Sequence, residues 1–216
     1  MLQREHVLAR IASEISASGD KPIVLVAVDG VDGAGKTCFA DELAKLLGEP
    51  VIRASVDSFH NPRSVRYARG RSSPRGFFED SFNYAKLKEL LLDPLSDDPP
   101  RPYCCVSFDY RADSEVGLEW KDPPATGILV FDGIFLHRPE LVSYWDYSIF
   151  LDVSTEVSVR RCLDREGVTG VSDDPEDPRH ARYVRGQALY LEACDPMAKC
   201  TRRIANEVIE APRVVA

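Results

Sequence analysis

Long apolar runs are missing from this 216-residue sequence. A helix that crosses a membrane needs about 20 consecutive apolar residues, and no segment approaches that length. The first residues, MLQREHVLAR, also lack the apolar core of a secretory signal peptide. We therefore expect a protein of the cytoplasm that has no membrane partner.

Cysteine and histidine are few and show no metal-binding spacing. The six cysteines contain no C-x-x-C pair, and the four histidines are widely separated. We therefore expect no transition-metal site. In a reducing compartment we expect free thiols that are mostly buried. The cysteines are Cys38, Cys104, Cys105, Cys162, Cys194 and Cys200.

An excess of positive charge is also missing. The sequence has 35 acidic and 27 basic residues, which gives a formal net charge of -8. A net negative chain repels nucleic acid, so we expect no nucleic-acid partner. Positive charge is nevertheless concentrated in one segment, which contains a single acidic residue, Asp57. The arginines of this segment are Arg53, Arg63, Arg66, Arg69, Arg71 and Arg75.

The sequence does contain a regular alternation of apolar and amphipathic segments. Apolar, β-branched runs predict strands at about 23–28, 51–56, 103–110, 128–131, 147–153 and 207–209. Helical spacing predicts helices at about 2–18, 36–47, 84–92, 154–165 and 182–194. This alternation predicts one α/β domain over residues 1–216, with a parallel sheet between two layers of helices.

Two longer segments have the composition of loops. Residues 58–82 are rich in Gly, Pro, Ser and Arg, and residues 167–181 are acidic and contain Gly and Pro. Long loops in a compact domain are commonly functional. We expect the first segment to lie where an acceptor molecule enters and the second to act as a lid.

The most specific motif is GVDGAGKT at residues 30–37, which fits the Walker A pattern G-x-x-x-x-G-K-[ST]. It lies between a predicted buried strand and a predicted helix, as the pattern requires. Consecutive backbone N–H groups can surround phosphates, and glycine allows the backbone to approach them closely. We expect ATP to contact Gly30, Asp32, Gly33, Ala34, Gly35, Lys36, Thr37 and Cys38.

Three side chains are candidates for the chemistry at such a loop. Lys36 is expected to bind the β- and γ-phosphates, and the Thr37 hydroxyl is expected to bind Mg²⁺. Asp132 ends the apolar run ILVF, which is typical of a Walker B carboxylate that holds the same metal ion. A strand-end aspartate can also simply cap a turn.

Asp57 is the candidate that distinguishes a kinase from other P-loop proteins. The sequence has no N-K-x-D motif for guanine, and Asp57 directly follows the second predicted strand. The carboxyl ends of parallel strands border the ligand crevice, so Asp57 could accept a proton from an attacking hydroxyl group. The alternative is a local turn with Ser58 and Phe59. We expect a phosphotransferase that acts on a small-molecule hydroxyl acceptor.

Taken together, these motifs resemble the uridine kinase family, whose relatives include pantothenate kinase and phosphoribulokinase. The segments that carry the resemblance are GAGKT, VDSFH (56–60), FDY (108–110) and VFDGI (130–134), and the likeness extends over about residues 23–210. The resemblance implies a P-loop NTPase fold with a lid, the use of ATP and Mg²⁺, and Asp57 as the catalytic base. Family members often self-associate, so a homo-oligomer is compatible with it.

The resemblance also suggests residues that contact the acceptor and the phosphates. Asp80 is similar to a family aspartate that binds ribose hydroxyl groups. Arg161 and Arg165 are similar to lid arginines: Arg161 is expected to contact the acceptor and the transferred phosphoryl group, and Arg165 the ATP phosphates.

The sequence departs from the family where the nucleobase would bind. His60 stands where the family has a tyrosine, and a role for it in acceptor binding is one interpretation. Phe108 retains an aromatic floor, but Asp113 replaces the histidine that reads the base.

The arginines at 63–75 leave the acceptor open, because arginine recognises phosphate and carboxylate groups. An anionic acceptor, in a sugar-, sugar-phosphate- or pantothenate-type kinase, is therefore an alternative to a nucleoside. The arginines could instead pair with nearby acids, including those at 173–177, or remain solvated. A third hypothesis is a non-catalytic protein that uses ATP as a switch.

Overall fold

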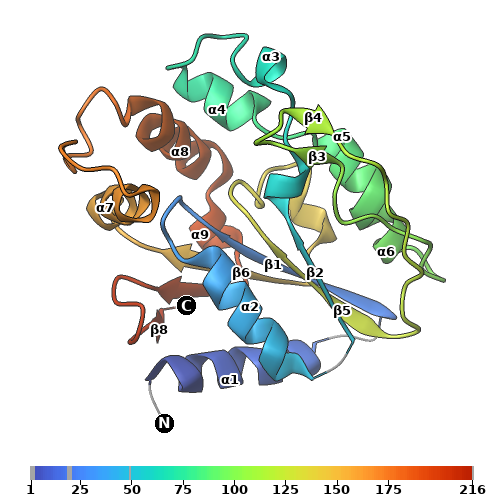
Figure 1. Cartoon of the computed structure of the whole chain (residues 1–216). Coiled ribbons are helices and arrows are strands. Elements are labelled where there is room, and N and C mark those ends of the chain that lie inside the picture. The colour runs from blue at the N-terminus through green and yellow to red at the C-terminus, as the bar shows by residue number, and fades with distance from the viewer. Residues whose placement is uncertain (1–2, 19–20, 49, 216) are drawn as a thin grey trace.

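The structure, a computed structural model, describes residues 3–18, 21–48 and 50–215. A six-stranded sheet crosses the middle of the molecule, and helices cover both of its faces (Figure 1). The strands lie in the order β2-β5-β1-β6-β7-β8, and only β8 is antiparallel to its neighbour. Their bounds are β1 (Ile23–Gly30), β2 (Val51–Ser55), β5 (Gly127–Asp132), β6 (Tyr147–Asp152), β7 (Arg202–Ala205) and β8 (Arg213–Val214).

The central strand β1 is buried along its whole length because both of its faces pack against helices. Alternate side chains enter two separate cores, as the two-residue repeat of a strand requires. Leu25 and Ala27 belong to the core on one face, whereas Val26 and Val28 belong to the core on the other.

One helical layer contains α1 (Gln3–Ser16) and α2 (Lys36–Leu47), and the opposite layer contains most of the other helices (Figure 1). The opposite layer includes α4 (Pro74–Asp80), α5 (Tyr84–Leu87), the π-helical turn η2 (Lys88–Leu92), α6 (Asp93–Ser96), α8 (Ala181–Cys194) and α9 (Pro196–Lys199). α7 (Thr155–Glu166) follows β6. Three shorter pieces are η1 (Val56–Phe59), α3 (Arg63–Arg66) and η3 (Val142–Tyr144).

The predicted three-layer architecture is confirmed: parallel strands β2, β5, β1, β6 and β7 lie between two layers of helices. The strand and helix that flank residues 30–37 also lie where the sequence places them. None of the helices in the described part of the chain has the length and apolar character that a bilayer crossing requires.

Three of four further local predictions are wrong. Residues 58–82 are not one loop, because α3 and α4 form within them; Ser73 accepts a hydrogen bond from the Gly76 amide and so caps α4. The predicted helix at 84–92 is confirmed, as α5 followed by the π-helical η2, and it continues into α6. Only β3 (Phe108–Asp109) forms within 103–110, paired with β4 (Ser114–Glu115). Residues 207–209 form a turn between β7 and β8.

The first helix and the proposed lid need smaller corrections. α1 begins at Gln3 and ends at Ser16, and residue 2, which the prediction included, lies outside the described residues. The segment 167–180 joins α7 to α8 without a helix or strand of its own, as expected, whereas Ala181, which the prediction included, begins α8. His180, at the end of this segment, makes a hydrogen bond from Nε2 to the carbonyl oxygen of Ser172 (2.7 Å), which closes the segment on itself.

Candidate active site

The glycine loop, residues 30–37, packs directly against its neighbours because it carries glycine at two crowded positions. At Gly33 the backbone has φ +68°, and a Cβ atom would lie 2.6 Å from the carbonyl oxygen of Ser158 in α7. At Gly30 a Cβ atom would lie 2.7 Å from the carbonyl oxygen of Leu151 in β6. Larger residues at either position would displace the loop.

Lys36 begins α2, so its ammonium group lies at the positive end of the helix dipole. Its Nζ donates a hydrogen bond to the carbonyl oxygen of Val31 at 2.8 Å and therefore spans the glycine loop. A helix N-terminus that combines glycine, backbone N–H groups and an ammonium group is suited to bind a polyphosphate.

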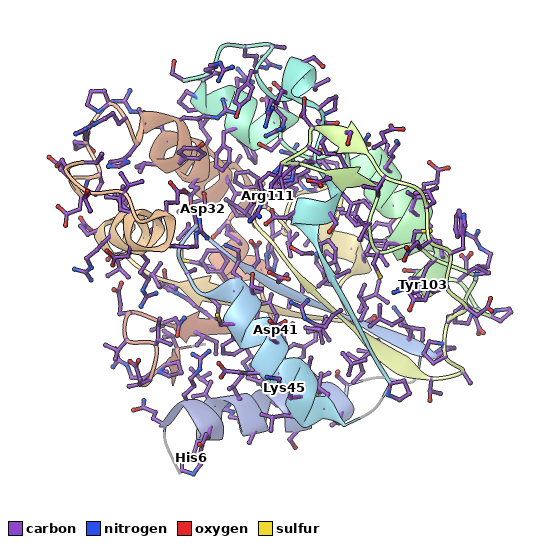
Figure 2. All side chains as sticks on the ribbon, in the orientation of Figure 1. His6, Asp32, Asp41, Lys45, Tyr103 and Arg111 are labelled. Carbon is purple, nitrogen blue, oxygen red and sulfur yellow. The ribbon has the colours of Figure 1, made fainter. Side chains whose placement is uncertain are left out.

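Asp132 lies at the end of β5 and is almost fully buried. One carboxylate oxygen accepts a hydrogen bond from the Thr37 hydroxyl at 2.8 Å, and the other accepts from Arg53 Nη2 at 2.9 Å. Arg53 on β2 also pairs with Asp41 on α2, which Figure 2 labels. The structure therefore brings the two predicted metal ligands, Thr37 and Asp132, together. It places Arg53 beside them and not with the arginines of 63–75.

Asp57 lies in η1, directly after β2, and its carboxylate is exposed. It borders a cavity of about 400 Å³ that separates η1 from the glycine loop. We call this space the central cavity. The predicted site residues that border it are Asp32, Gly33, Gly35, Lys36, Thr37, Cys38, Asp57, Asp132, Arg161 and Arg165. Gly30 and Ala34 are instead buried beneath the loop.

Close packing at Gly133 determines where η1 lies. A Cβ atom at Gly133 would be 2.4 Å from Val56 Cγ1, so glycine allows η1 to approach the end of β5. Val56 directly precedes Asp57, and Gly133 directly follows Asp132. This contact therefore sets the separation between the two carboxylates.

Arg161 and Arg165 both border the central cavity from α7, but they differ in their contacts. The Arg161 guanidinium donates to the carbonyl oxygens of Gly33 (3.3 Å), Asn206 (3.0 Å) and Glu207 (2.9 Å). It therefore joins the glycine loop to the turn after β7. The Arg165 side chain is exposed, and its Nη2 lies 4.0 Å from Glu166 Oε1. Its guanidinium is therefore held less firmly than that of Arg161.

Asp32 is the one acid within the glycine loop. Burial raises the pKa of its carboxyl group, Lys36 opposes this effect, and Asp57 adds to it. Its backbone N–H donates to Gln187 Oε1 at 2.7 Å, and its backbone carbonyl accepts from Ser158 Oγ at 2.6 Å. Two helices, α7 and α8, therefore hold this residue in place.

His60 lies beside Asp57, where its Nδ1 donates to the Asp57 carbonyl oxygen at 2.8 Å. Its ring contacts Phe82 and Tyr110, with centroid separations of 4.5 and 5.2 Å. Burial lowers the pKa of His60, so the imidazole is mainly neutral at neutral pH. A neutral ring between two aromatic rings offers an apolar wall rather than a charge.

Phe108 and Asp113 border a different cavity of about 200 Å³, which His60 also borders. Phe108 is buried. The Asp113 carboxylate accepts hydrogen bonds from the Arg63 backbone N–H (2.9 Å) and from Arg66 Nη2 (3.2 Å), so it holds α3 in place. The structure does not bring these two predicted acceptor residues to the central cavity.

Asp80 ends α4 and pairs with Arg69 at 2.9 Å. Three arginines of 63–75 form ion pairs: Arg66 with Asp113, Arg75 with Glu79, and Arg69 with Glu79 as well as Asp80. Arg63 instead donates to the Arg111 carbonyl oxygen, and Arg71 lies over the ring of Tyr67. The ionic partners of Arg66, Arg69 and Arg75 are therefore acids near them in space. The sequence suggested the acids at 173–177 as partners of these arginines. One of those acids, Asp177, pairs with Arg179 instead.

Sequence reasoning missed two buried polar residues beside the glycine loop, Asn206 and Asp29. Asn206 donates from Nδ2 to the carbonyl oxygen of Ala34 at 2.7 Å. Asp29 is fully buried beneath Gly30 and accepts hydrogen bonds from its N–H (2.7 Å), from His137 Nδ1 (2.7 Å) and from the Tyr190 hydroxyl. An acid inside the apolar run IVLVAVDG was the available signal for Asp29.

Comparison with solved structures identifies the fold, although no protein-family model matches the chain. A candidate uridine kinase from Bacillus stearothermophilus matches with a TM-score of 0.71 and 18% identity, over 92% of this chain and 97% of that chain. A candidate fructose transport system kinase from a Silicibacter species matches with a TM-score of 0.68 and 24% identity, over 87% and 94%. A D-glycerate 3-kinase from Cryptococcus neoformans matches with a TM-score of 0.60 and 14% identity, over 99% and 97%. The chain therefore has the fold of these P-loop kinases.

Proposed function

We propose that this chain is a kinase that transfers the γ-phosphoryl group of ATP to a hydroxyl group of a small molecule, with a nucleoside as the first candidate acceptor. One observation carries the proposal. Lys36 on the glycine loop and Asp57 at the end of β2 face the same cavity of about 400 Å³. A phosphate-binding loop opposite an exposed carboxylate, with space between them, is the arrangement that phosphoryl transfer to a hydroxyl group requires.

The residues present fit Mg-ATP. The glycine loop offers backbone N–H groups at the N-terminus of α2, and Lys36 adds a positive charge. Mg²⁺ typically binds one or two protein oxygens together with phosphates and water, and Thr37 and Asp132 would provide that share. Among the described residues there is no larger cluster of metal-binding side chains. Bound Mg-ATP supplies the phosphoryl group and neutralises part of its charge.

The residues of the chain then have separate tasks. Asp57 orients the acceptor hydroxyl and accepts its proton. Lys36 and Arg165 balance the negative charge of the transferred group, while Arg161 keeps the glycine loop attached to the turn after β7. The segment 167–181 covers the site and excludes water, which would otherwise consume ATP.

Substitution of Asp57 tests the proposal directly. We expect Asp57→Asn to keep the affinity for ATP and to reduce phosphoryl transfer by about 10²- to 10⁴-fold, because a general base contributes that much. Lys36→Ala should abolish transfer. The measurements are release of ADP in the presence of a panel of nucleosides, sugars, pantothenate and sugar phosphates, and ATP binding by calorimetry.

Unchanged turnover in Asp57→Asn would remove this residue from the catalytic role. A wild-type protein that binds ATP but phosphorylates no member of the panel would instead support the hypothesis of an ATP-dependent switch.

A further inference from the structure

Helix α8 contacts two distant parts of the chain with buried polar side chains, although none of the described residues that line the central cavity belongs to it. One part is the glycine loop. The other is residues 63–80, which contain α3 and α4 and which we call the arginine segment. Figure 1 shows α4 and α8 side by side, and their residues are in contact. α8 therefore lies between the arginine segment and the glycine loop.

Gln187 is the contact of α8 with the glycine loop. Its Oε1 accepts a hydrogen bond from the Asp32 backbone N–H at 2.7 Å, and its Nε2 donates to the Tyr183 carbonyl oxygen at 3.1 Å. The second bond fixes the side-chain amide so that its oxygen faces the loop. The Gln187 side chain is buried. The position of the loop at Asp32 therefore follows the position of α8.

Arg182 is the contact of α8 with the arginine segment. Its Nη1 donates to the carbonyl oxygens of Ser73 (3.0 Å) and Arg71 (3.3 Å), and its Nη2 donates to that of Arg66 (3.1 Å). Its guanidinium also lies over the ring of Tyr67, 4.9 Å from the centroid. The side chain is buried, and its planar set of donors fastens the first turn of α8 to the segment.

Gly186 brings the same two elements into direct backbone contact. A Cβ atom at this position would lie 2.8 Å from both Phe77 Cδ1 and the carbonyl oxygen of Pro74, at the start of α4. Gly186 directly precedes Gln187. Because packed elements of this kind move together, a displacement of α4 would shift the side chain that holds Asp32.

We propose that Gln187 and Arg182 are positioning residues, and that through them α8 couples the arginine segment to the glycine loop. ATP affinity then depends on how firmly the segment is held, and bound ATP in turn stabilises the segment, because coupling between two sites is reciprocal. The consequence for the reaction rests on the proposed kinase function: an acceptor that contacts the arginine segment would tighten the binding of ATP.

Hydrogen exchange of the wild-type protein tests the coupling without a known acceptor. The probe is Mg²⁺ with the non-hydrolysable ATP analogue AMP-PNP. The Tyr67 and Gly70 amides are bonded within the arginine segment, at 3.0 and 2.9 Å, and exchange only when it opens. We expect the analogue to slow their exchange at least about fivefold, a modest coupling between sites. Residues 117–120, at the surface, should exchange at an unchanged rate.

Substitutions on α8 test the two positioning residues. We expect Gln187→Leu and Arg182→Met each to weaken ATP binding about 3- to 10-fold, as loss of one to two neutral hydrogen bonds implies. Calorimetry measures the affinity, and circular dichroism confirms the fold. If both act along α8, Arg182→Met should have little further effect in the Gln187→Leu background, at least about threefold less than in the wild type. Gln187→Leu should also abolish the protection of the arginine segment by AMP-PNP.

Two matched controls separate this route from general loosening. Ser158→Ala removes the bond at 2.6 Å that ties the Asp32 carbonyl to α7 instead of α8. It should weaken ATP binding as well, but Arg182→Met should keep its full effect in that background. Arg185→Met replaces an exposed arginine of the same helix and should leave ATP affinity unchanged.

Three results would overturn the inference: unchanged exchange in the arginine segment, unchanged ATP affinity in Gln187→Leu, or additive effects of Gln187→Leu and Arg182→Met. If Arg182→Met does not fold, the exchange of the wild type and of Gln187→Leu decides. If these experiments fail while a panel acceptor is phosphorylated, only the coupling is wrong. If they succeed while no acceptor is phosphorylated, the coupling stands and the kinase proposal falls.

Discussion

At the scale of single residues, the carboxylate of Asp132 has the most constrained surroundings. Both of its oxygens are engaged, one by the Thr37 hydroxyl and the other by Arg53. The Arg53 guanidinium also donates to the Val130 carbonyl oxygen at 2.7 Å. Arg53 is therefore a positioning residue that orients Asp132, which in turn orients Thr37.

Removal of Arg53 should leave the buried Asp132 carboxylate with the Thr37 hydroxyl as its remaining side-chain partner among the described residues. We expect Arg53→Met to lower the free energy of unfolding by about 2–4 kcal/mol, since loss of one partner exposes the desolvation cost of the other. Urea unfolding at neutral pH measures this. In the control, Asp41→Asn removes the exposed partner of the same arginine and should cost about 0.5 kcal/mol. If Arg53→Met and Asp41→Asn lowered the free energy of unfolding equally, the buried pair of Arg53 with Asp132 would not be the source of the effect.

At the scale of elements, η1 carries Asp57 on a short turn whose position depends on Gly133. A Cβ atom there would lie 2.4 Å from the buried, β-branched Val56, which has little freedom to move away. A substitution at residue 133 would therefore displace η1 and leave the glycine loop in place.

We expect Gly133→Ala to reduce stability by about 1–3 kcal/mol through overpacking. It should also reduce kcat at least about 10-fold, because a shift of about 1 Å can misalign a reacting group. ATP affinity should stay within about twofold of the wild type. Gly117→Ala, where a new Cβ atom would meet open space, is the control. Loss of ATP binding in Gly133→Ala would show that the contact serves the nucleotide rather than Asp57.

The sequence predicted those elements whose signals are local. Residues 23–47 give strand, glycine loop and helix in one continuous stretch, and Asp132 ends an apolar run, so periodicity and motif spacing were sufficient. The partners of Arg66 and Arg69 could not be predicted in the same way, because Asp113 lies 47 residues from Arg66 and only the folded chain brings them together. Gln187 and Asn206 were missed for the same reason: no local pattern relates them to Asp32 and Ala34.

At the scale of the whole molecule, Glu14 attaches α1 to the sheet. Its carboxylate accepts hydrogen bonds from the Tyr147 hydroxyl at 2.5 Å in β6 and from Arg202 Nε at 2.8 Å in β7. Burial alone would raise the pKa of Glu14, but hydrogen bonds from Tyr147, Arg10 and Arg202 outweigh it and lower the pKa to about 2. An acid with a lowered pKa stabilises the fold in its charged form.

This pKa gives a pH-dependent prediction. The contribution of Glu14 is complete above the ordinary pKa of about 4.3 and disappears as the pH falls towards 2. We expect Glu14→Gln to lower the free energy of unfolding by about 2 kcal/mol at pH 7, with the difference from wild type shrinking between pH 4.5 and 2. Urea unfolding across this range, with the exposed Glu192→Gln as the control, measures it. If the difference in free energy of unfolding between Glu14→Gln and the wild type did not change with pH, the charge of Glu14 would not be its cause.

The buried carboxylate of Asp29 links the glycine loop to α8. It receives the first amide of the glycine loop from one side and the hydroxyl of Tyr190, in the middle of α8, from the other. A rotation of α8 that widened the entrance would therefore pull on the amide of Gly30. Movements of α8 and of the glycine loop would then be coupled through this one carboxylate.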